Sequence, residues 1–181
     1  MNDSPPAAEL DEQASADEIF ARAASRAQGS GFAYAGSVTP AEAHRLAQLG
    51  AATLVDIRTR PELEFVGRIE GSHLVEWRAW GAADPHPDFV EKVTADLGTD
   101  QPLLLICRSG VRSHNAATAL AQAGHRHAYN ILQGFEGDRD GHGRRNTVGG
   151  WRFAGLRTTS SLAVSAISMS TRAISLQRLV I

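Results

Sequence analysis

The segment LLLICRSGVRS, which runs from Leu103 to Ser113, contains the only cysteine of the 181-residue chain. Cys107 follows four apolar residues and precedes a short loop with one glycine and two arginines. The main-chain N–H groups of such a loop can converge on one anion, and the guanidinium groups of Arg108 and Arg112 add positive charge. These groups favour a thiolate over a thiol, and the thiolate is the nucleophilic form of cysteine. The pattern predicts nucleophilic chemistry at Cys107.

An inert, buried thiol is the alternative interpretation of Cys107, because free cysteine is among the most buried residue types. That interpretation explains a thiol at the end of an apolar strand. It gives no reason for the two arginines and for Gly110, whose conformational freedom permits a tight turn around the sulfur. No Cys–His pairing is evident, since His114 follows the loop but is expected to lie on a helix. We therefore interpret Cys107 as a functional thiol.

Strand and helix patterns alternate along the chain around this loop. Short apolar strands are predicted at residues 52–58, 72–77, 102–110 and 127–132. Helices are predicted at residues 38–50, 86–98 and 113–125, and residues 60–71 are predicted to hold a short helix followed by a turn. This rhythm is typical of an α/β domain with a mainly parallel sheet flanked by helices. Asp56 and Cys107 each end a strand, so both are expected at the sheet edge where ligands bind in such folds.

Capping residues mark where several of these helices begin. Ser15 with Glu18 has the pattern of a capping box, and Thr39 followed by Pro40 is typical of a helix N-terminus. Ser113 is predicted to be the N-cap of the helix that follows the cysteine loop. That arrangement would aim the positive end of the helix dipole at the sulfur.

The chain divides by composition into four parts. Residues 1–14 are rich in Pro, Ala and acidic residues and are expected to be a disordered extension. Residues 15–30 are predicted to form an N-terminal helix, and residues 31–157 the main domain. Residues 158–181, rich in Ser and Thr, form a tail that we expect to be disordered or weakly helical. The glycine-rich segment 134–151 is expected to line the mouth of the site.

Charge and composition exclude several classes of protein. The net charge of −2 argues against general nucleic-acid binding, which needs a basic patch. A single cysteine cannot form an internal disulfide, and no apolar run approaches membrane-spanning length. The seven histidines lack the spacing of metal ligands. We expect a cytoplasmic protein with no membrane span, no metal and no cofactor.

Three sequence blocks, in this order, resemble rhodanese-type sulfurtransferase domains. They are LVDIRTRPELEFVGRIEGSHLVEW, CRSGVRS and GFEGD…TVGGW. The resemblance runs from about residue 39 to residue 155 and is nearest to the compact single-domain rhodaneses of bacteria. It implies a three-layer domain with a five-stranded sheet. The tail departs from the family, whose compact members end soon after the glycine-tryptophan segment.

The resemblance also implies a mechanism and a set of site residues. Cys107 would take the sulfane sulfur of thiosulfate or another persulfide donor and carry it as a persulfide. A thiol, cyanide or a protein would then accept the sulfur. Asp56 and Arg58 match the family's Asp-x-Arg and would brace the site. The substrate-binding residues would be Arg108, Ser109, Gly110, Val111, Arg112 and Ser113.

The length of the loop bears on related activities of the same fold. Cysteine phosphatases and arsenate reductases need a Cys-x5-Arg loop to wrap a tetrahedral anion, whereas Arg112 gives Cys-x4-Arg here. The shorter loop favours a single sulfur atom. A sulfur-relay or interaction module without independent turnover is the second hypothesis, since an intact Cys107 does not separate an enzyme from a relay component.

Overall fold

The computed structural model describes residues 13–159, and within that range the chain folds around one parallel sheet. The strands are β1 (Gly36–Val38), β2 (Thr53–Asp56), β3 (His73–Leu74), β4 (Leu103–Ile106) and β5 (Ala128–Ile131). Their order is β1-β5-β4-β2-β3, and every neighbouring pair runs parallel. The predicted α/β class with a five-stranded, mainly parallel sheet is confirmed.

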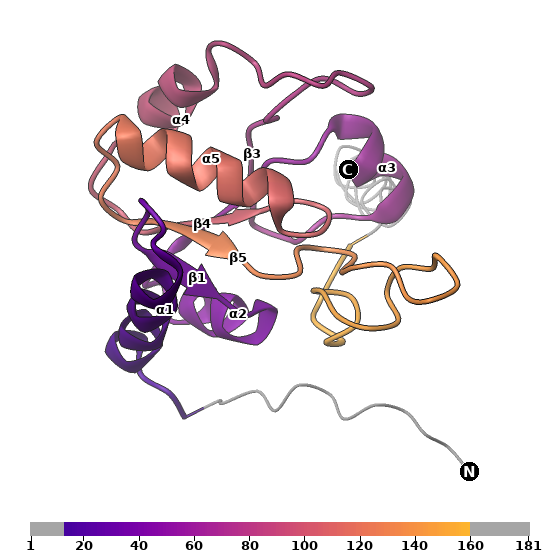
Figure 1. Cartoon of the computed structure of the whole chain (residues 1–181), viewed down its shortest axis with the longest axis horizontal. Coiled ribbons are helices and arrows are strands. Elements are labelled where there is room, and N and C mark those ends of the chain that lie inside the picture. Colours follow the sequence, from indigo (N-terminus) through magenta and orange to yellow (C-terminus); the bar gives the residue numbers. More distant parts are fainter. Residues whose placement is uncertain (1–12, 160–181) are drawn as a thin grey trace, which may run out of the picture.

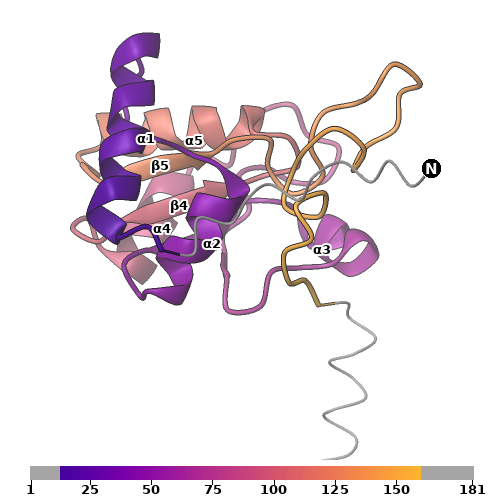
Figure 2. The same cartoon turned by 90° about the horizontal axis from the view of Figure 1, so that it is seen from below.

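Helices cover both faces of the sheet and make a three-layer structure. The helices are α1 (Ala16–Ser30), α2 (Pro40–Gln48), α3 (Arg60–Val66), α4 (Phe89–Leu97) and α5 (Val111–Gln122). Helices α1 and α2 pack on one face, α4 and α5 pack on the other, and α3 lies at the end of the sheet toward which β5 points (Figure 1). Figure 2 shows the segment after β5 at this same end, beside α3. No helix in residues 13–159 has the length and apolar character needed to cross a membrane.

The burial of β4 on both faces of the sheet explains why its sequence shows no alternation of apolar and polar residues. Leu103, Leu105 and Cys107 pack into the core beneath α4 and α5. Leu104 and Ile106 pack into the opposite core, beneath α1 and α2. A central parallel strand is buried on both faces, so every residue along it is apolar. Cys107 therefore stands at the end of a rigid, fully enclosed strand.

Local capping signals fix the first two helices where the sequence predicted them. Ser15 and Glu18 form a capping box at the start of α1, and Thr39 and Glu42 form another at the start of α2. Strand β1 was missed by the sequence analysis. Its sequence, Gly-Ser-Val, has no apolar run, and its extended shape depends on pairing with β5.

The chain ends of the described part are both held to the domain. Ala14 is buried, and the guanidinium group of Arg45 donates to its carbonyl oxygen at 3.3 Å. Thr159 exchanges two main-chain hydrogen bonds of 2.9 Å with Arg68. The predictions of disorder for the rest of 1–14 and of a weakly ordered tail concern residues that lie almost wholly outside the described range.

Candidate active site

The two strand ends predicted to meet at one edge of the sheet do so. Asp56, the last residue of β2, lies in register with Ile106, the last residue of β4. The pairing continues for one step, because Ile57 N–H donates to the Ile106 carbonyl oxygen at 2.9 Å. Cys107 follows at once. The carboxyl edge of the central strands therefore carries Cys107 beside the Asp56 segment, where parallel sheets bind ligands.

The sulfur of Cys107 is enclosed and receives two hydrogen bonds. The residue has no solvent exposure. The Gly110 main-chain N–H donates to Sγ at 3.1 Å, and the Ser113 hydroxyl donates to Sγ at 3.3 Å. Donors converging on one sulfur stabilise a negative charge on it more than they stabilise a neutral thiol. The loop therefore presents two hydrogen-bond donors to a single enclosed sulfur atom.

Helix α5 begins earlier than its sequence suggested. The prediction that Ser113 is the N-cap is wrong, because Gly110 occupies that position and Val111 is the first helical residue. Gly110 has a φ of 92°, which a glycine adopts without strain, and this lets the chain turn into the helix directly. Ser113 consequently lies inside the first turn. Its hydroxyl does not cap the helix. The hydroxyl oxygen lies within hydrogen-bond distance of two acceptors, Cys107 Sγ at 3.3 Å and the Gly110 carbonyl oxygen at 3.2 Å.

The segment after β5 supports the cysteine loop from behind. Phe135 N–H donates to the Cys107 carbonyl oxygen at 2.8 Å, and Glu136 N–H donates to the Arg108 carbonyl oxygen at 2.9 Å. Gly134, with a φ of 61°, brings the two backbones into contact. None of the residues that line the pocket beside the cysteine loop belongs to segment 134–151. The glycine-rich segment, which was expected to line the mouth of the site, holds the cysteine loop in place from behind.

This contact predicts a strong effect of a single methyl group. In Gly134→Ala the new Cβ would lie 2.5 Å from the Cys107 carbonyl oxygen and 2.7 Å from the Ser109 nitrogen. We expect a loss of about 1–3 kcal/mol in the free energy of unfolding, because both backbones must shift and the φ is unfavourable. Urea unfolding measures it. Gly141→Ala in the same segment meets nothing within 4 Å and should be nearly neutral. Equal losses in the two variants would contradict the packing argument.

Asp56 and Arg58 form a fully buried ion pair below the loop. The Arg58 Nε and Nη2 atoms donate to the Asp56 carboxylate at 2.9 Å and 2.6 Å. Nη2 also donates to the Gly67 carbonyl oxygen at 3.0 Å, and the guanidinium lies 3.7 Å from the centre of the Phe135 ring. The pair joins the end of β2, the end of α3 and the segment after β5.

Arg112, predicted to bind the donor, is already paired with a carboxylate that the sequence analysis missed. Its two terminal nitrogens donate to Glu62 of α3 at 2.9 Å and 2.6 Å. Burial by itself would raise the pKa of Glu62. The Arg112 side chain and the N–H and O–H of Thr59 outweigh burial and lower that pKa to about 2. Burial likewise opposes the charge of Arg112, but Glu62, with smaller contributions from Cys107 and Asp56, raises the pKa of Arg112.

This ion pair gives the stability of the protein a defined pH dependence. Glu62 titrates near 2 in the folded chain and near 4.5 in the unfolded chain, so its stabilising effect is complete above pH 4.5. That effect is lost as the pH falls from about 4.5 to about 2. Glu62→Gln should cost about 2 kcal/mol at pH 7, after allowance for partial solvent access. Thermal unfolding of both proteins should converge at pH 2; a constant difference at every pH would refute the assignment.

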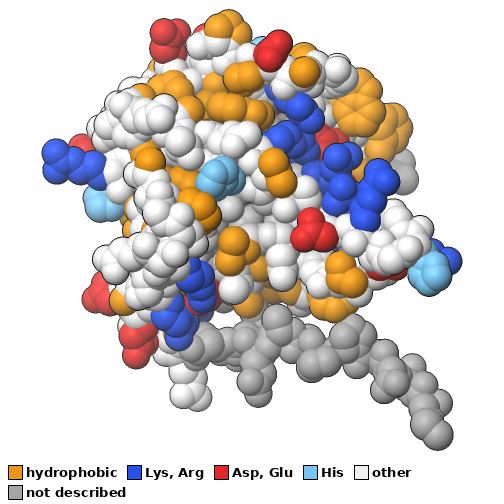
Figure 3. Space-filling model, viewed as in Figure 1, with side chains coloured by type: hydrophobic (Ala, Val, Ile, Leu, Met, Phe, Trp, Pro, Cys, Tyr) orange, Lys and Arg blue, Asp and Glu red, His pale blue; other side chains and the backbone are white. Residues whose placement is uncertain are grey.

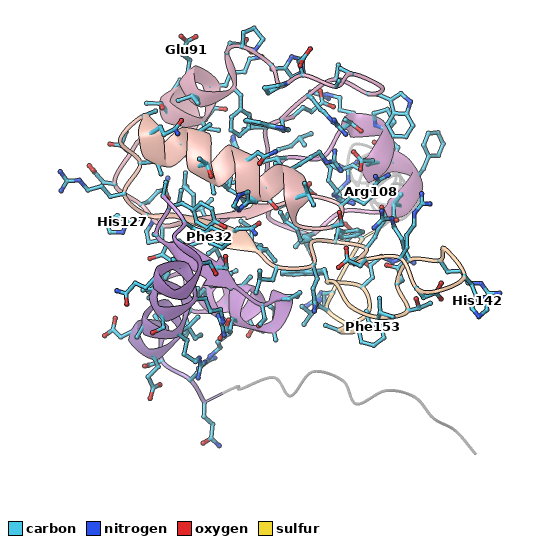
Figure 4. The ribbon with its side chains drawn as sticks, in the orientation of Figure 1. Phe32, Glu91, Arg108, His127, His142 and Phe153 are labelled. Atoms are coloured by element: carbon cyan, nitrogen blue, oxygen red, sulfur yellow. The ribbon has the colours of Figure 1, made fainter. Side chains whose placement is uncertain are left out.

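A pocket opens beside the loop and is lined by three arginines. Its volume is about 260 Å³, and its walls come from the starts of α3 and α5, the cysteine loop and the loop after β3. The lining residues are Thr59, Glu62, Arg78, Ala79, Trp80, Gly81, Arg108 and Arg112. Figure 4 labels Arg108 beside α3, and Figure 3 shows Lys and Arg side chains gathered on this face next to hydrophobic ones.

The other predicted loop residues differ in their exposure. Ser109 is half-buried, whereas Val111 is 65% exposed at the first position of α5.

Arg78 and Trp80 were not assigned to the site from the sequence. They belong to a loop about thirty residues before Cys107, and only folding brings them to the pocket. A sequence signal for them would have required knowing that β3 lies next to β2.

A parallel five-stranded α/β domain with a cysteine cradled at the end of its central strand is the architecture of a rhodanese-like domain. The chain belongs to this family: the family model described as Rhodanese-like domain matches residues 39–139. The expected family resemblance is confirmed.

Individual relatives agree with that assignment. The chain is 32% identical over 104 residues to Uncharacterized protein RC0915 of Rickettsia conorii, covering 56% of this chain and 84% of the relative. It is 25% identical over 130 residues to Thiosulfate sulfurtransferase GlpE of Actinobacillus succinogenes, covering 72% and 96%. The crystal structure of Rv0390 from M. tuberculosis superposes with a TM-score of 0.63 at 35% identity, covering 71% of this chain and 99% of that one.

Proposed function

We propose that this protein is a sulfurtransferase that carries sulfane sulfur as a persulfide on Cys107. One observation carries the proposal: Sγ, enclosed at the end of β4, accepts hydrogen bonds from Gly110 N–H and Ser113 O–H. Family membership and the relatives named thiosulfate sulfurtransferase support the same class of reaction.

Two half-reactions make up the transfer. The Cys107 thiolate attacks the outer sulfur of thiosulfate, the S–S bond of the donor breaks, and sulfite leaves with the electron pair. The persulfide anion that remains is stabilised by the same N–H and O–H donors, as an oxyanion is stabilised in acyl transfer. A thiolate or cyanide then attacks the terminal sulfur, and Cys107 leaves as the thiolate. The reaction needs no cofactor, because each sulfur transfer displaces a thiolate or sulfite.

The residues around the sulfur have distinct proposed roles. Arg108 attracts the anionic donor to the mouth of the site. Arg112, held by Glu62, fixes the first turn of α5 next to the cysteine loop. Asp56 and Arg58 brace the loop from below. A cytoplasmic location and a protein as sulfur acceptor stay predictions.

Loading of the thiol tests the proposal directly. We expect the protein, incubated with thiosulfate, to gain one sulfur atom in its intact mass and to release thiocyanate when cyanide is added. Because Cys107 is the only cysteine, the added sulfur has one thiol to occupy. A protein that accepts sulfur from a persulfidated partner but not from thiosulfate would support the relay hypothesis. Hydrolysis of an aryl phosphate that depends on Cys107 would favour a phosphatase.

A further inference from the structure

Charge compensation separates the arginines of the site pocket into two kinds. Arg112 is neutralised by its bidentate pair with Glu62. Arg78 and Arg108 form no ion pair with any carboxylate among residues 13–159. Arg108 is exposed and Arg78 is half-buried in the pocket wall. The positive charge available to a ligand therefore comes from Arg78 and Arg108.

Arg78 is held at the pocket by the residue before it. The Trp77 N–H donates to the Ile57 carbonyl oxygen at 3.1 Å, which ties the loop after β3 to the end of β2. The Trp77 ring packs edge-on against Phe89 of α4, with ring centres 4.8 Å apart. Arg78 then donates to the Ala83 carbonyl oxygen at 3.2 Å across the loop. A fixed backbone and a folded-back guanidinium give Arg78 a defined place.

The pocket also has an aromatic wall and more room than an inorganic donor needs. Trp80 lines it and is 68% exposed, which is unusual for so large an apolar side chain. A volume of about 260 Å³ corresponds to roughly nine water molecules at about 30 Å³ each. Thiosulfate has no carbon to place against an indole ring. The combination of an apolar wall and uncompensated guanidinium groups fits an organic anion.

We propose that Arg78, Arg108 and Trp80 form a recognition site for the sulfur acceptor, and that the acceptor is an organic thiol bearing carboxylates. This inference rests on the proposed function. The two arginines bind the carboxylates, Trp80 contacts the carbon skeleton, and the thiol reaches the persulfide of Cys107 from the pocket side. Guanidinium groups suit carboxylates because they offer paired N–H donors.

The transfer balances without a further reactant. The acceptor thiolate attacks the terminal sulfur of the Cys107 persulfide, and a new S–S bond forms on the acceptor. The bond between that sulfur and Sγ breaks, and Cys107 leaves with the electron pair as a thiolate. The product is the persulfide of the organic thiol.

Single-turnover transfer from loaded protein tests the site. The protein is loaded with sulfur, desalted, and mixed with mercaptosuccinate or with the neutral thiol thioglycerol, and the loss of the persulfide is followed by intact mass. Arg78→Ala should lower the rate constant for mercaptosuccinate about tenfold and leave that for thioglycerol within about twofold. Each comparison uses one thiol on two proteins, so the intrinsic reactivity of the thiol cancels. Added salt should reduce the effect.

Three further variants define the interpretation. Arg78→Lys keeps the charge and should retain most of the mercaptosuccinate rate. Trp80→Ala should slow both organic thiols, since each loses the apolar wall. Arg126→Ala removes an exposed arginine beyond the far end of α5 and should change nothing. Equal slowing of both thiols by Arg78→Ala, or no slowing of mercaptosuccinate, would overturn the proposal.

Failure of the proposed function is distinguishable from failure of this inference. If thiosulfate does not load Cys107, inorganic polysulfide can load it without donor recognition, and the acceptor comparison proceeds unchanged. If polysulfide also leaves Cys107 unmodified, both the persulfide mechanism and the acceptor site are wrong.

Discussion

Cys107→Ser is expected to lower sulfur transfer from thiosulfate to cyanide by at least about 10³-fold, with the fold intact. A serine hydroxyl occupies nearly the same space and can accept the same hydrogen bonds from Gly110 and Ser113. It ionises far too weakly to attack at neutral pH, and an oxygen cannot carry the sulfane sulfur as a persulfide. The loss is therefore chemical in origin.

Two measurements separate lost chemistry from lost structure. Thiocyanate release reports the transfer, and intact mass after incubation with thiosulfate reports the loading of sulfur. The thermal unfolding midpoint of Cys107→Ser should stay within a few degrees of the parent protein. A serine variant that still turns over at the parent rate would refute the persulfide mechanism.

Asp56→Asn is expected to cause the largest loss of stability, about 3–5 kcal/mol in the free energy of unfolding. Both members of the Asp56–Arg58 pair have side chains with no solvent exposure. The asparagine removes the only carboxylate bonded to Arg58 in the described part of the chain and leaves a buried cation beneath the cysteine loop. An unpaired buried charge keeps its full desolvation cost.

An exposed ion pair supplies the matched control for this substitution. The Asp88 Oδ2 and Lys92 Nζ atoms are 2.8 Å apart, and the two side chains are 45% and 54% exposed. Asp88→Asn should cost no more than about 1 kcal/mol, because water already screens the pair. Urea unfolding of both variants gives the comparison. If Asp56→Asn costs no more than Asp88→Asn, the buried pair does not brace the site.

Local sequence signals were enough to place most elements of the fold. Capping boxes begin with Ser15 and Thr39, and each depends on residues three positions apart. The apolar run of β4 reflects burial on both faces, which a sequence pattern reveals directly. The end of that run located Cys107 at the ligand-binding edge.

Local sequence patterns did not predict the elements that depend on contacts with residues far along the chain. Strand β1 is extended because it pairs with β5, and a Cβ at Gly36 would meet the Ala23 backbone at 2.5 Å. The sequence Gly-Ser-Val predicts neither the pairing with β5 nor the contact with Ala23. The start of α5 was placed too late, because a serine is a common N-cap. At Gly110 a Cβ would lie 3.2 Å from the Gln133 nitrogen, a contact that no local pattern reveals.

The features of the candidate site likewise fall into those that the sequence predicted and those that only the folded structure revealed. The sequence by itself predicted a nucleophilic role for Cys107, and it determined the loop of four residues between Cys107 and Arg112 and the meeting of Asp56 with Cys107 at one edge. All of these follow from short-range patterns and parallel pairing. Only the tertiary structure decided that Arg112 is neutralised by Glu62, and that Arg78 lines the same pocket with no carboxylate partner among residues 13–159. The physical reason is that an ion pair or a pocket wall joins residues far apart in the chain, and no local pattern encodes which side chains the packed layers bring together.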